Sequence, residues 1–532
     1  MGKKDSSITV VQQSNQDVAS KKGLLRSTSI VSALTLLSRV LGLVRDIVIA
    51  QVFGASPAMD AFLIAFRIPN FFRRLFAEGA FSQAFVPVIS EYIKKRPHEE
   101  VQRLVNHAAG TLGGILLAMT AVAMVFSPWI VMVFAPGFAQ VESKMLLAGD
   151  LLLVTFPYLF FISMTAFAGG VLNSKGHFAT PAFAPTLLNI CSIAAALWFG
   201  RYFEAPIMAQ AWAVSISGVL QLLIQFPALK RIHLFPKPQW GWRDEGVQRV
   251  LRLMLPALFG VSVSQINMLI GSMMASFLPH GSVTWIYYAD RLMELPLGVF
   301  GVAVGTVLLP SLSKHYANHD SQAYSAGLDW GLRSVLLVGC PAALGLLYLG
   351  EPILFSLFQG GAFSARDVHM TDLCLKAYSV AVLGFIILKV ILPAYFARQD
   401  TKTPVKVAVI ALLTNIILNL ALIRFLAHVG LALSTSIAAV VNVSLLYFGL
   451  VRSGAYKPCD QWHLWWTQII LACVAMVLVI HWITPATDYW MAATRINRLM
   501  ALAAIMMAAV ITYGMVLFAT GVRRQNFTKM GA

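Results

Sequence analysis

Residues 105–134 read VNHAAGTLGGILLAMTAVAMVFSPWIVMVF and contain no Lys, Arg, Asp or Glu. A helix of about 20 apolar residues is long enough to cross a hydrocarbon core about 30 Å thick. The whole chain of 532 residues has the same character, since 58% of it is hydrophobic and only 12% is charged. Soluble domains are about 45–50% apolar and about 25% charged. The chain therefore has too few polar groups to cover its surface in water, and the sequence predicts an all-α polytopic membrane protein.

Fourteen runs of this kind, each of about 20 or more residues, follow one another along the chain. Several are impure because Gly, Pro or charged residues interrupt them. We place them at residues 27–53, 58–92, 105–134, 145–172, 180–199, 207–228, 249–278, 283–312, 325–349, 367–396, 404–425, 429–451, 463–483 and 497–521. The first run is too long for a signal peptide, and Arg39 and Arg45 interrupt it. We therefore expect the N-terminus to stay attached.

The net charge of +17 raises the question of nucleic-acid binding. The basic residues lie in short breaks between apolar runs rather than on one face of a folded domain, which is the pattern that orients a membrane protein. With the N-terminus in the cytoplasm, about 25 Lys and Arg fall on the cytoplasmic side and about six on the outer side, as the positive-inside rule requires. The sequence predicts fourteen spans with both termini in the cytoplasm, and no nucleic-acid partner.

The segments outside these runs predict little chemistry. Residues 1–26 are basic and polar, which is typical of a disordered cytoplasmic extension. Residues 229–248 are basic with interleaved Trp and Phe, which favours a cytoplasmic linker at the membrane interface. The five cysteines are scattered and show neither CxxC nor Cys/His spacing. The sequence therefore predicts no disulfide framework, no metal site and no cofactor.

An internal repeat relates two parts of the chain. VPVISE at 86–91 resembles LPSLSK at 309–314, and the Thr-Pro pair at 180–181 matches the pair at 403–404. Both matches have an offset of about 223 residues. The first six spans therefore map onto spans seven to twelve in the same orientation. We expect an N-lobe at 27–228 and a C-lobe at 249–452. Residues 453–532 then add spans thirteen and fourteen and a cytoplasmic tail.

Charged residues at bilayer depth mark the candidate site, because an ionisable group there normally faces a cavity or a partner. The charged residues within the apolar runs include Arg39, Arg45, Asp46, Arg67, Arg73, Arg74, Glu78, Asp290, Arg291, Glu294, Lys376 and Lys389. Spacing places Arg39 and Asp46 on one helix face and allows local pairing of Arg74 with Glu78 and of Arg291 with Glu294. Away from the ends of the first two runs, five arginines accompany two carboxylates, Asp46 and Glu78.

The excess of arginines favours a wet cationic cavity, and guanidinium forks bind phosphate or pyrophosphate with two hydrogen bonds. Arg39, Arg45, Arg73 and Arg291 are the candidate anion-binding residues. Asp46, Arg74, Glu78, Asp290 and Glu294 are candidate charge pairs. Satisfied ion pairs or arginines that reach the membrane surface are the alternative, most of all for Arg67 and for Arg74 with Glu78. Lys389 is either a charge-coupling residue or the partner of an unidentified carboxylate.

At these residues the chain resembles a known family. SRVLGLVRD at 38–46, the run from Asp60 to Phe81 with RIPNFFRRLFAEGAF at 67–81, and YYADRLME at 287–294 resemble signature segments of the MurJ (MviN) lipid II flippases. RQD at 398–400 followed by KTP at 402–404 also fits. The likeness covers the chain after about residue 25. The basic N-terminal extension departs from the usual short start of the family.

This resemblance implies a member of the MOP exporter superfamily with two six-helix lobes and two extra helices that border a groove for a lipid tail. Its substrate would be lipid II, an undecaprenyl pyrophosphate carrying a disaccharide-pentapeptide, moved to the periplasmic leaflet of the bacterial inner membrane. The family's cavity arginines correspond to Arg39, Arg45, Arg73 and Arg291, with Asp46, Glu78 and Glu294 as associated carboxylates. Membrane lipid and other proteins of cell-wall synthesis are the further partners that it implies.

We expect alternating access without covalent chemistry, so the protein is predicted to be a transporter and not an enzyme. One rival is a flippase for another undecaprenyl-pyrophosphate-linked oligosaccharide. A second is a related multidrug exporter, although an exporter of cations should favour acidic residues in its cavity. A membrane enzyme acting on prenyl-linked sugars would need clustered acidic metal ligands, and the chain has no DDxxD-like motif.

Overall fold

The computed structural model describes residues 5–75, 81–298, 302–459 and 461–522. Within these ranges the secondary structure is helical, and the extended pairing consists of one isolated bridge between Gly360 and Phe363. The chain divides into two compact units, the first made of residues 1–49, 61–132 and 142–265, and the second made of 50–60, 133–141 and 266–532.

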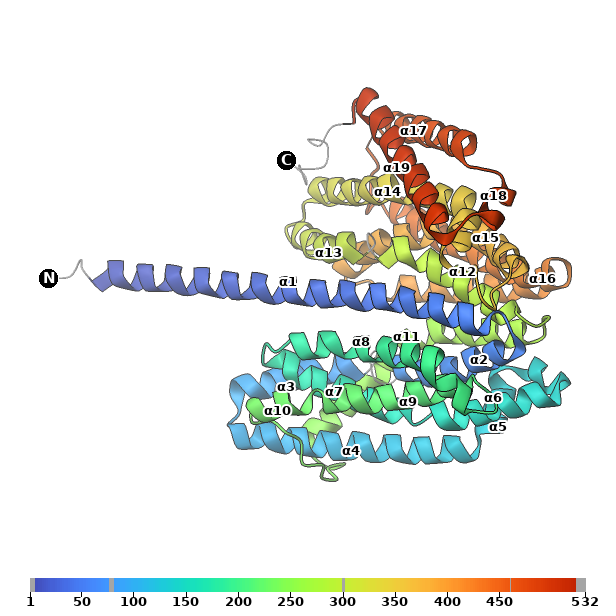
Figure 1. Cartoon of the computed structure of the whole chain (residues 1–532). Helices are drawn as coiled ribbons and strands as arrows, with labels where there is room; N and C mark the ends of the chain where they lie inside the picture. Colours follow the sequence, from blue (N-terminus) through green and yellow to red (C-terminus); the bar gives the residue numbers. More distant parts are fainter. Residues whose placement is uncertain (1–4, 76–80, 299–301, 460, 523–532) are drawn as a thin grey trace. The chain divides into compact units, whose positions relative to one another are not determined.

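The helices from the N-terminus to the end of the first unit are drawn from blue to green in Figure 1. They are α1 (Asp5–Phe53), α2 (Pro57–Phe72), α3 (Ser82–Lys95), α4 (His98–Val125), α5 (Ser127–Phe134), η2 (Pro136–Gln140), α6 (Glu142–Thr155), α7 (Tyr158–Ser174), α8 (Ala179–Ala194), the π-helix η3 (Ala195–Phe199), η4 (Gly200–Tyr202), α9 (Met208–Leu223), α10 (Phe226–Arg231) and α11 (Glu245–Ser276). Helix α7 is central, because it contacts α3, α4, α8 and α9 and is buried over most of its length.

The remaining helices belong to the second unit. They are α12 (Ser282–Pro296), α13 (Val302–Ala317), α14 (Ser321–Leu357), α15 (Ala365–Ala397), α16 (Lys402–Arg452), α17 (Trp462–Ile483), α18 (Thr487–Ala492) and α19 (Arg495–Ala519). Helix α15 packs against α12, α13, α14 and α16. Helices α17 and α19 pack against each other and against α14, as Figure 1 shows in red and yellow.

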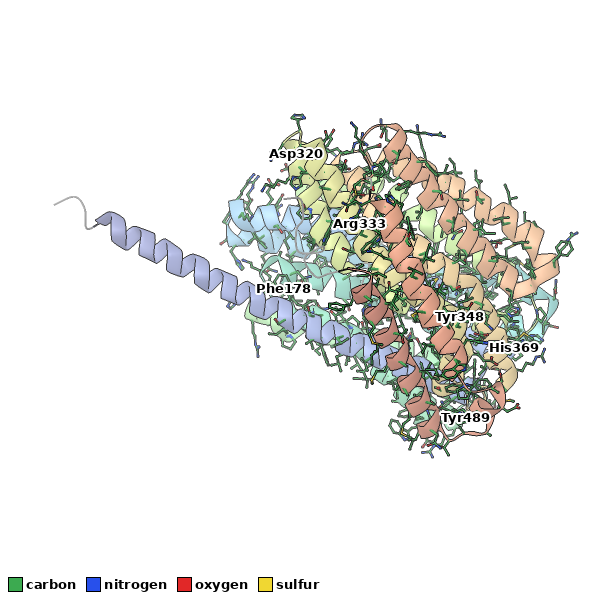
Figure 2. The ribbon with its side chains drawn as sticks, turned by 90° about the horizontal axis from the view of Figure 1, so that it is seen from above. Phe178, Asp320, Arg333, Tyr348, His369 and Tyr489 are labelled. Atoms are coloured by element: carbon green, nitrogen blue, oxygen red, sulfur yellow. The ribbon has the colours of Figure 1, made fainter. Side chains whose placement is uncertain are left out.

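A cation on α14 fixes α17. The Arg333 guanidinium lies 5.3 Å from the ring centroid of Trp462 and 5.7 Å from that of Trp465, both on α17. Figure 2 labels Arg333 on its helix. Because a cation over an indole face is attracted by the ring quadrupole, this contact joins the last helix pair to the rest of the second unit.

The apolar runs of the sequence lie on helices throughout the described ranges. Nine helices there are long and apolar enough to cross a membrane, and the longest of them, α16, contains two predicted spans. The predicted break between those two spans is real, since Ala427 has a φ of 46° and a ψ of −125° inside α16. Spans one, two and eight, which are not among the nine, hold most of the charges at membrane depth. The multi-pass character of the chain is thus clear from its helices.

Helix boundaries reproduce the internal repeat. Helix α4 begins at His98 and α14 at Ser321, and α8 begins at Ala179 and α16 at Lys402. Each pair of starts is 223 residues apart, the same offset as that of the Thr-Pro pairs. The repeat therefore extends from short sequence matches to the positions at which helices start.

The start of α16 explains one of the family-like segments. Asp400 accepts hydrogen bonds from the backbone N–H of Thr403 at 3.0 Å and from its hydroxyl at 2.7 Å. These two bonds hold the pKa of the Asp400 carboxyl below its usual range, since they stabilise the charged form. Pro404 follows in the first turn, where its missing N–H removes no helical hydrogen bond. The segment is a helix-starting device.

The N-terminal extension differs from the prediction. Disorder was predicted for residues 1–26, but the backbone of α1 is helical from Asp5 onward. Once the apolar part of α1 has formed, each further helical residue costs little, because only nucleation is expensive. Residues 5–26 contain one Gly and no Pro to stop that propagation.

Candidate substrate site

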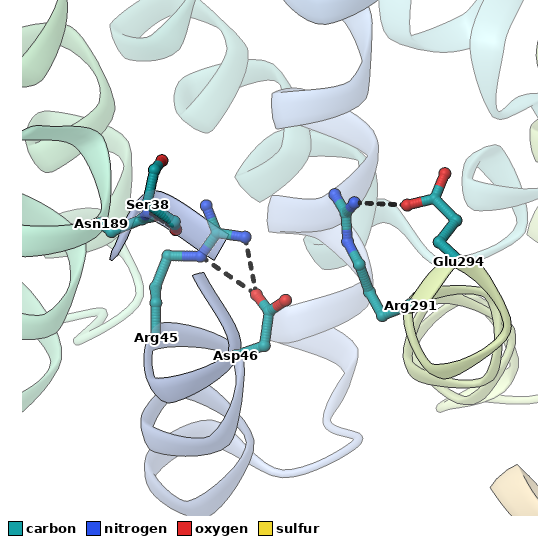
Figure 3. Close-up of polar contacts among 6 residues, drawn as sticks. All are labelled: Ser38, Arg45, Asp46, Asn189, Arg291 and Glu294. Carbon is teal, nitrogen blue, oxygen red and sulfur yellow. Dashed lines mark hydrogen bonds and ion pairs between the residues drawn. The ribbon is translucent and has the colours of Figure 1, made fainter. Parts of the chain in front are cut away.

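The most buried ion pair among the site residues lies on α1. The Arg45 guanidinium donates two hydrogen bonds to Oδ1 of Asp46, from Nε at 3.0 Å and from its terminal nitrogen at 2.7 Å (Figure 3). The two side chains are only 11% and 7% exposed. Helical spacing had placed Asp46 on the face of Arg39, seven residues earlier. Neighbouring helix positions point about 100° apart. The Arg45 side chain is long enough to bend across this angle and contact Asp46.

Arg39 has a different environment on the same helix. Its side chain is exposed and makes no hydrogen bond or ion pair with the described residues. Nearby, the Asn189 amide of α8 donates to the backbone carbonyl of Ser38 at 2.9 Å (Figure 3). The same amide lies beside Gly42, where a Cβ would be 3.7 Å from Nδ2 of Asn189. Asn189 thus fixes the helix segment from which Arg39 and Arg45 project.

Helix α2 and the turn that follows it supply the second group of arginines, and Pro69 lies inside α2. Because Pro69 has no N–H, the carbonyl of Ala65 loses its helical donor. The buried hydroxyl of Thr155, on α6, donates to this carbonyl at 3.2 Å. The proline is thereby accommodated in an unbroken helix, as is common in membrane proteins.

Asn70, next to that proline, orients Arg73. Its amide donates to the carbonyl of Phe66 at 2.7 Å, and its Oδ1 accepts from Nε of Arg73 at 3.0 Å. Arg73 is half-buried, as is Arg67, whereas Arg74 is exposed. Glu78, the predicted partner of Arg74, lies outside the described residues. The amide oxygen of Asn70 thus orients the Arg73 side chain.

In the second unit, α12 carries Arg291, Glu294 and Asp290. Arg291 donates to Oε2 of Glu294 at 3.0 Å, the i,i+3 contact that the spacing predicts (Figure 3). Its guanidinium also lies 5.0 Å from the ring centroid of Tyr287. The two charged side chains are 34% and 44% exposed, and Asp290 is half-buried.

Asp60 positions α12 and was missed as a site residue. Its carboxylate is 1% exposed and accepts from the N–H of Gly281 at 2.9 Å, the N–H of Thr284 at 3.1 Å and the Thr284 hydroxyl at 2.8 Å. A negative charge at a helix N-terminus satisfies free N–H groups and is stabilised by the helix dipole. Gly281 itself has a φ of 90°, which glycine adopts without strain.

A second acid fixes the first turn of α12. The indole N–H of Trp285 donates to Oδ1 of Asp367 at 3.0 Å. Asp367 also forms a capping box with Ser364 at the start of α15. In the sequence, the capping role of Asp60 and Asp367 is indicated only by the position of each aspartate beside a turn. Their partners are distant in the chain, so spacing could not identify them.

Lys389 makes no ion pair in the part of the chain that the structure describes, and its side chain is exposed. The lysine of α15 that does pair is Lys376, whose Nζ lies 2.6 Å from Oδ2 of the fully buried Asp372. Among the described residues, no three His, Cys, Asp or Glu side chains are grouped so that they could hold a metal ion.

The guanidinium groups of these residues are chemically suited to bind an anion. Arg39, Arg45, Arg67, Arg73 and Arg74 belong to the first unit and Arg291 to the second. The contacts are hydrogen bonds and ion pairs that a phosphate oxygen could replace one for one, because carboxylate and phosphate present similar acceptors to a guanidinium.

Comparison with known proteins gives consistent matches. A family model described as lipid II flippase MurJ matches residues 49–520. The probable lipid II flippase MurJ of Haemophilus influenzae is 43% identical over 506 residues, which cover 93% of this chain and 99% of that protein. A solved structure of lipid II flippase MurJ in an inward closed conformation matches with a TM-score of 0.78 and 29% identity, covering 93% of this chain and 99% of that one.

A more distant match concerns the fold alone. A multidrug resistance MATE family transporter of the MOP superfamily, solved in an inward-facing conformation, matches with a TM-score of 0.64 and 14% identity. The match covers 80% of this chain and 98% of the transporter.

Proposed function

The chain belongs to the lipid II flippase MurJ family, and we propose that it moves lipid II from the cytoplasmic to the periplasmic leaflet of the bacterial inner membrane. Lipid II, with its undecaprenyl pyrophosphate and disaccharide-pentapeptide, offers the pyrophosphate that an arginine site recognises. No covalent bond changes in this process, so the protein acts as a transporter rather than as an enzyme.

The observation that carries the proposal is the number of arginines along α1, α2 and the turn after α2. Between residues 29 and 75 there are five arginines and two carboxylates, Asp46 and Asp60. Asp60 accepts hydrogen bonds at the start of α12, whereas Asp46 pairs with Arg45 on α1. A charge at membrane depth is expensive, so a stretch this rich in arginine favours an anionic partner or a wet cavity.

We infer an architecture of fourteen spans, with two six-helix lobes at 27–228 and 249–452 and both termini in the cytoplasm. The helix starts that recur after 223 residues support two copies of one bundle in the same orientation. The excess of basic residues in alternate loops supports the orientation. Helices α17 and α19 stand outside the repeat and form the wall of a groove for the prenyl tail.

The mechanism that we propose is alternating access, in which the head group enters a cationic cavity while the prenyl tail stays in lipid. Arg39, Arg45, Arg73 and Arg291 engage the pyrophosphate and the head group. The carboxylates Asp46, Glu78 and Glu294, with Arg74 and Asp290 beside them, re-form ion pairs when the substrate leaves. For an arginine that pairs with a carboxylate, such as Arg45 or Arg291, the exchange replaces one acceptor oxygen by another, so its charge stays compensated.

Cells depleted of the chromosomal flippase test the function. Complementation with this chain should restore lipid II at the periplasmic face, measured by its accessibility to an enzyme or probe added outside. Arg45→Ala and Arg291→Ala should each reduce this signal at least about tenfold, because each removes a charge-assisted contact with the pyrophosphate.

Arg96→Ala is the matched control. Arg96 is exposed and pairs with Glu100 at 3.3 Å. The substitution therefore removes one positive charge at a position away from the candidate site. The variant should transport like the wild type. Full rescue by both Arg45→Ala and Arg291→Ala would exclude the proposed site, and failure of the wild-type chain to restore accessibility would exclude the function.

A further inference from the structure

The segment between α10 and α11, residues 232–244, is bound along α4 rather than extended from it, and we call it the strap. The N–H of Lys237 donates to the Asn106 side chain at 2.8 Å, and the N–H of Gly241 donates to the Thr111 hydroxyl at 3.1 Å. Figure 1 shows the chain after α10 running beside α4. The basic, Trp-containing linker that the sequence indicated is therefore an ordered surface.

Two glycines of α4 let the strap approach closely. A Cβ on Gly110 would lie 2.1 Å from the carbonyl oxygen of Gln239, and a Cβ on Gly114 would lie 2.8 Å from the ring of Trp240. Either contact is too short for a real side chain. The strap follows α4 from Gln102, which donates to the Phe235 carbonyl at 2.9 Å, to Gly114. That is a rise of about 18 Å along the helix.

A cavity of about 820 Å³ lies between the strap and α4. Its polar and aromatic lining consists of Arg103, His107, Trp240, Trp242, Arg243 and Asp244. Pockets for small organic molecules are commonly about 300–1,000 Å³, so a polar head group fits this volume. All of these residues belong to the first unit, and the cavity is separate from the arginines of α1 and α2.

The two arginines of the cavity are available to a ligand. Arg103 and Arg243 are exposed and form no ion pair or hydrogen bond with any residue that the structure describes. A nearby basic residue behaves differently, since Arg249 donates to Glu91 at 2.8 Å. Arg103 and Arg243 thus differ from Arg249, because neither pairs with an acid among the described residues.

The one carboxylate in the cavity, Asp244, is already engaged. Its Oδ2 lies 3.0 Å from Nδ1 of His107. Its Oδ1 accepts from the N–H groups of Gly246 at 3.0 Å and Val247 at 3.2 Å in the first turn of α11. The acid therefore serves the start of α11, and the field inside the cavity stays positive.

The aromatic side chains give the cavity an apolar rim. Trp240 and Trp242 stack with ring centroids 6.4 Å apart and an interplanar angle of 12°, and they are 66% and 48% exposed. Neither indole N–H has a hydrogen-bond partner among the described residues. Exposed tryptophans in membrane proteins concentrate at the level of the lipid head groups, where the ring contacts lipid and the N–H contacts polar groups.

We propose that this cavity binds the head-group phosphate of an anionic phospholipid. Arg103 and Arg243 hold the phosphate, and the Trp pair lies beside the glycerol ester region. A free phosphate would leave the exposed rings without an apolar neighbour, whereas a phospholipid provides both the charge and the hydrocarbon. Strap and α4 would then be held together by a lipid at the edge of the membrane. This inference is independent of which substrate is transported.

The test is lipid binding to the purified full-length chain in detergent, measured by native mass spectrometry. Phosphatidylglycerol and phosphatidylcholine with identical acyl chains are titrated, with and without inorganic phosphate as competitor. We expect the wild type to bind phosphatidylglycerol at least about tenfold more tightly, since each arginine near the head groups contributes to binding of an anionic lipid. R103Q/R243Q should lose that preference, and inorganic phosphate should not displace the lipid.

K94Q/K402Q is the control, because it removes two exposed cations outside the cavity and should bind like the wild type. R103K/R243K keeps both charges, so it should bind within about threefold of the wild type, because the attraction of an anionic lipid depends mainly on charge. An unfolding midpoint of R103Q/R243Q equal to that of the wild type shows that the Gln variant is folded. Wild-type affinity in R103Q/R243Q, equal binding of phosphatidylcholine, or displacement by inorganic phosphate would each overturn the proposal.

Discussion

Two ion pairs of the same chemistry, Arg45 with Asp46 and Arg291 with Glu294, lie in different environments. The first joins adjacent residues of α1 and is at most 11% exposed. The second joins residues one helical turn apart on α12 and is 34% and 44% exposed. Burial removes water as a competing partner, so breaking the first pair leaves an uncompensated charge, whereas water can replace either partner of the second.

The difference in exposure suggests that the two ion pairs have different roles. We propose that the buried pair contributes to the stability of α1, because its charges are shielded from water. We propose that the exposed pair opens at less cost, so that Arg291 can exchange Glu294 for an anion. The predictions below test this contrast in order of decreasing effect.

Asp46→Asn should have the largest effect on stability. It removes the carboxylate charge that the buried Arg45 guanidinium contacts, and breaking such a pair costs about 3–5 kcal/mol. We expect a marked fall in the thermal unfolding midpoint in detergent. The double variant R45Q/D46N, which removes both charges, should regain much of the loss. If the single variant were as stable as the wild type, the pair would not be the buried contact described here.

Asp60→Ala tests what supports the exposed pair. The variant removes a buried carboxylate that accepts three hydrogen bonds at the start of α12. Loss of a helix cap of this kind costs about 1–2 kcal/mol, and the unpaired N–H groups add to that. Transport should fall as well, because Arg291 lies on the same helix. Asp320→Ala, at the exposed start of α14, is a control that removes a cap without a buried network.

Thr155→Val tests the backbone of α2. Valine has the same shape but cannot donate to the Ala65 carbonyl that Pro69 leaves free. A buried carbonyl without a donor costs about 1–3 kcal/mol, so the unfolding midpoint should fall by less than in Asp46→Asn. The companion variant Thr155→Ser keeps the hydroxyl and should be closer to the wild type. Equal stability of the Val variant and the wild type would show that the carbonyl finds another donor.

The sequence predicts those interactions whose partners are close together in the chain. Apolar runs determine helices locally, which is why the break at Ala427 falls between two predicted spans. The Arg291–Glu294 contact is also local, and spacing predicts it. The cap that Asp60 provides for Gly281 joins residues 221 positions apart, which no spacing rule reaches.

Local rules also failed for the Arg45–Asp46 pair, and for a physical reason. Helical periodicity describes where Cβ atoms point, and adjacent positions point about 100° apart. The flexible arginine side chain bends across that angle. Whether the two residues make contact therefore depends on the length of the side chain and not on which helix face its Cβ occupies. Whether the four candidate arginines meet one substrate remains a prediction that the transport variants decide.

Glu294→Gln should have the smallest effect on stability and a larger one on transport. A half-exposed pair contributes at most about 1 kcal/mol, so the unfolding midpoint should scarcely change. Transport should slow, because Arg291 loses the acid with which it pairs again after the substrate leaves. Periplasmic accessibility of lipid II over time, compared with Glu142→Gln on the exposed start of α6, measures the effect. Normal transport by Glu294→Gln would show that this pair has no role in resetting the protein, while a large loss of stability would show that its environment is as dry as that of Arg45 and Asp46.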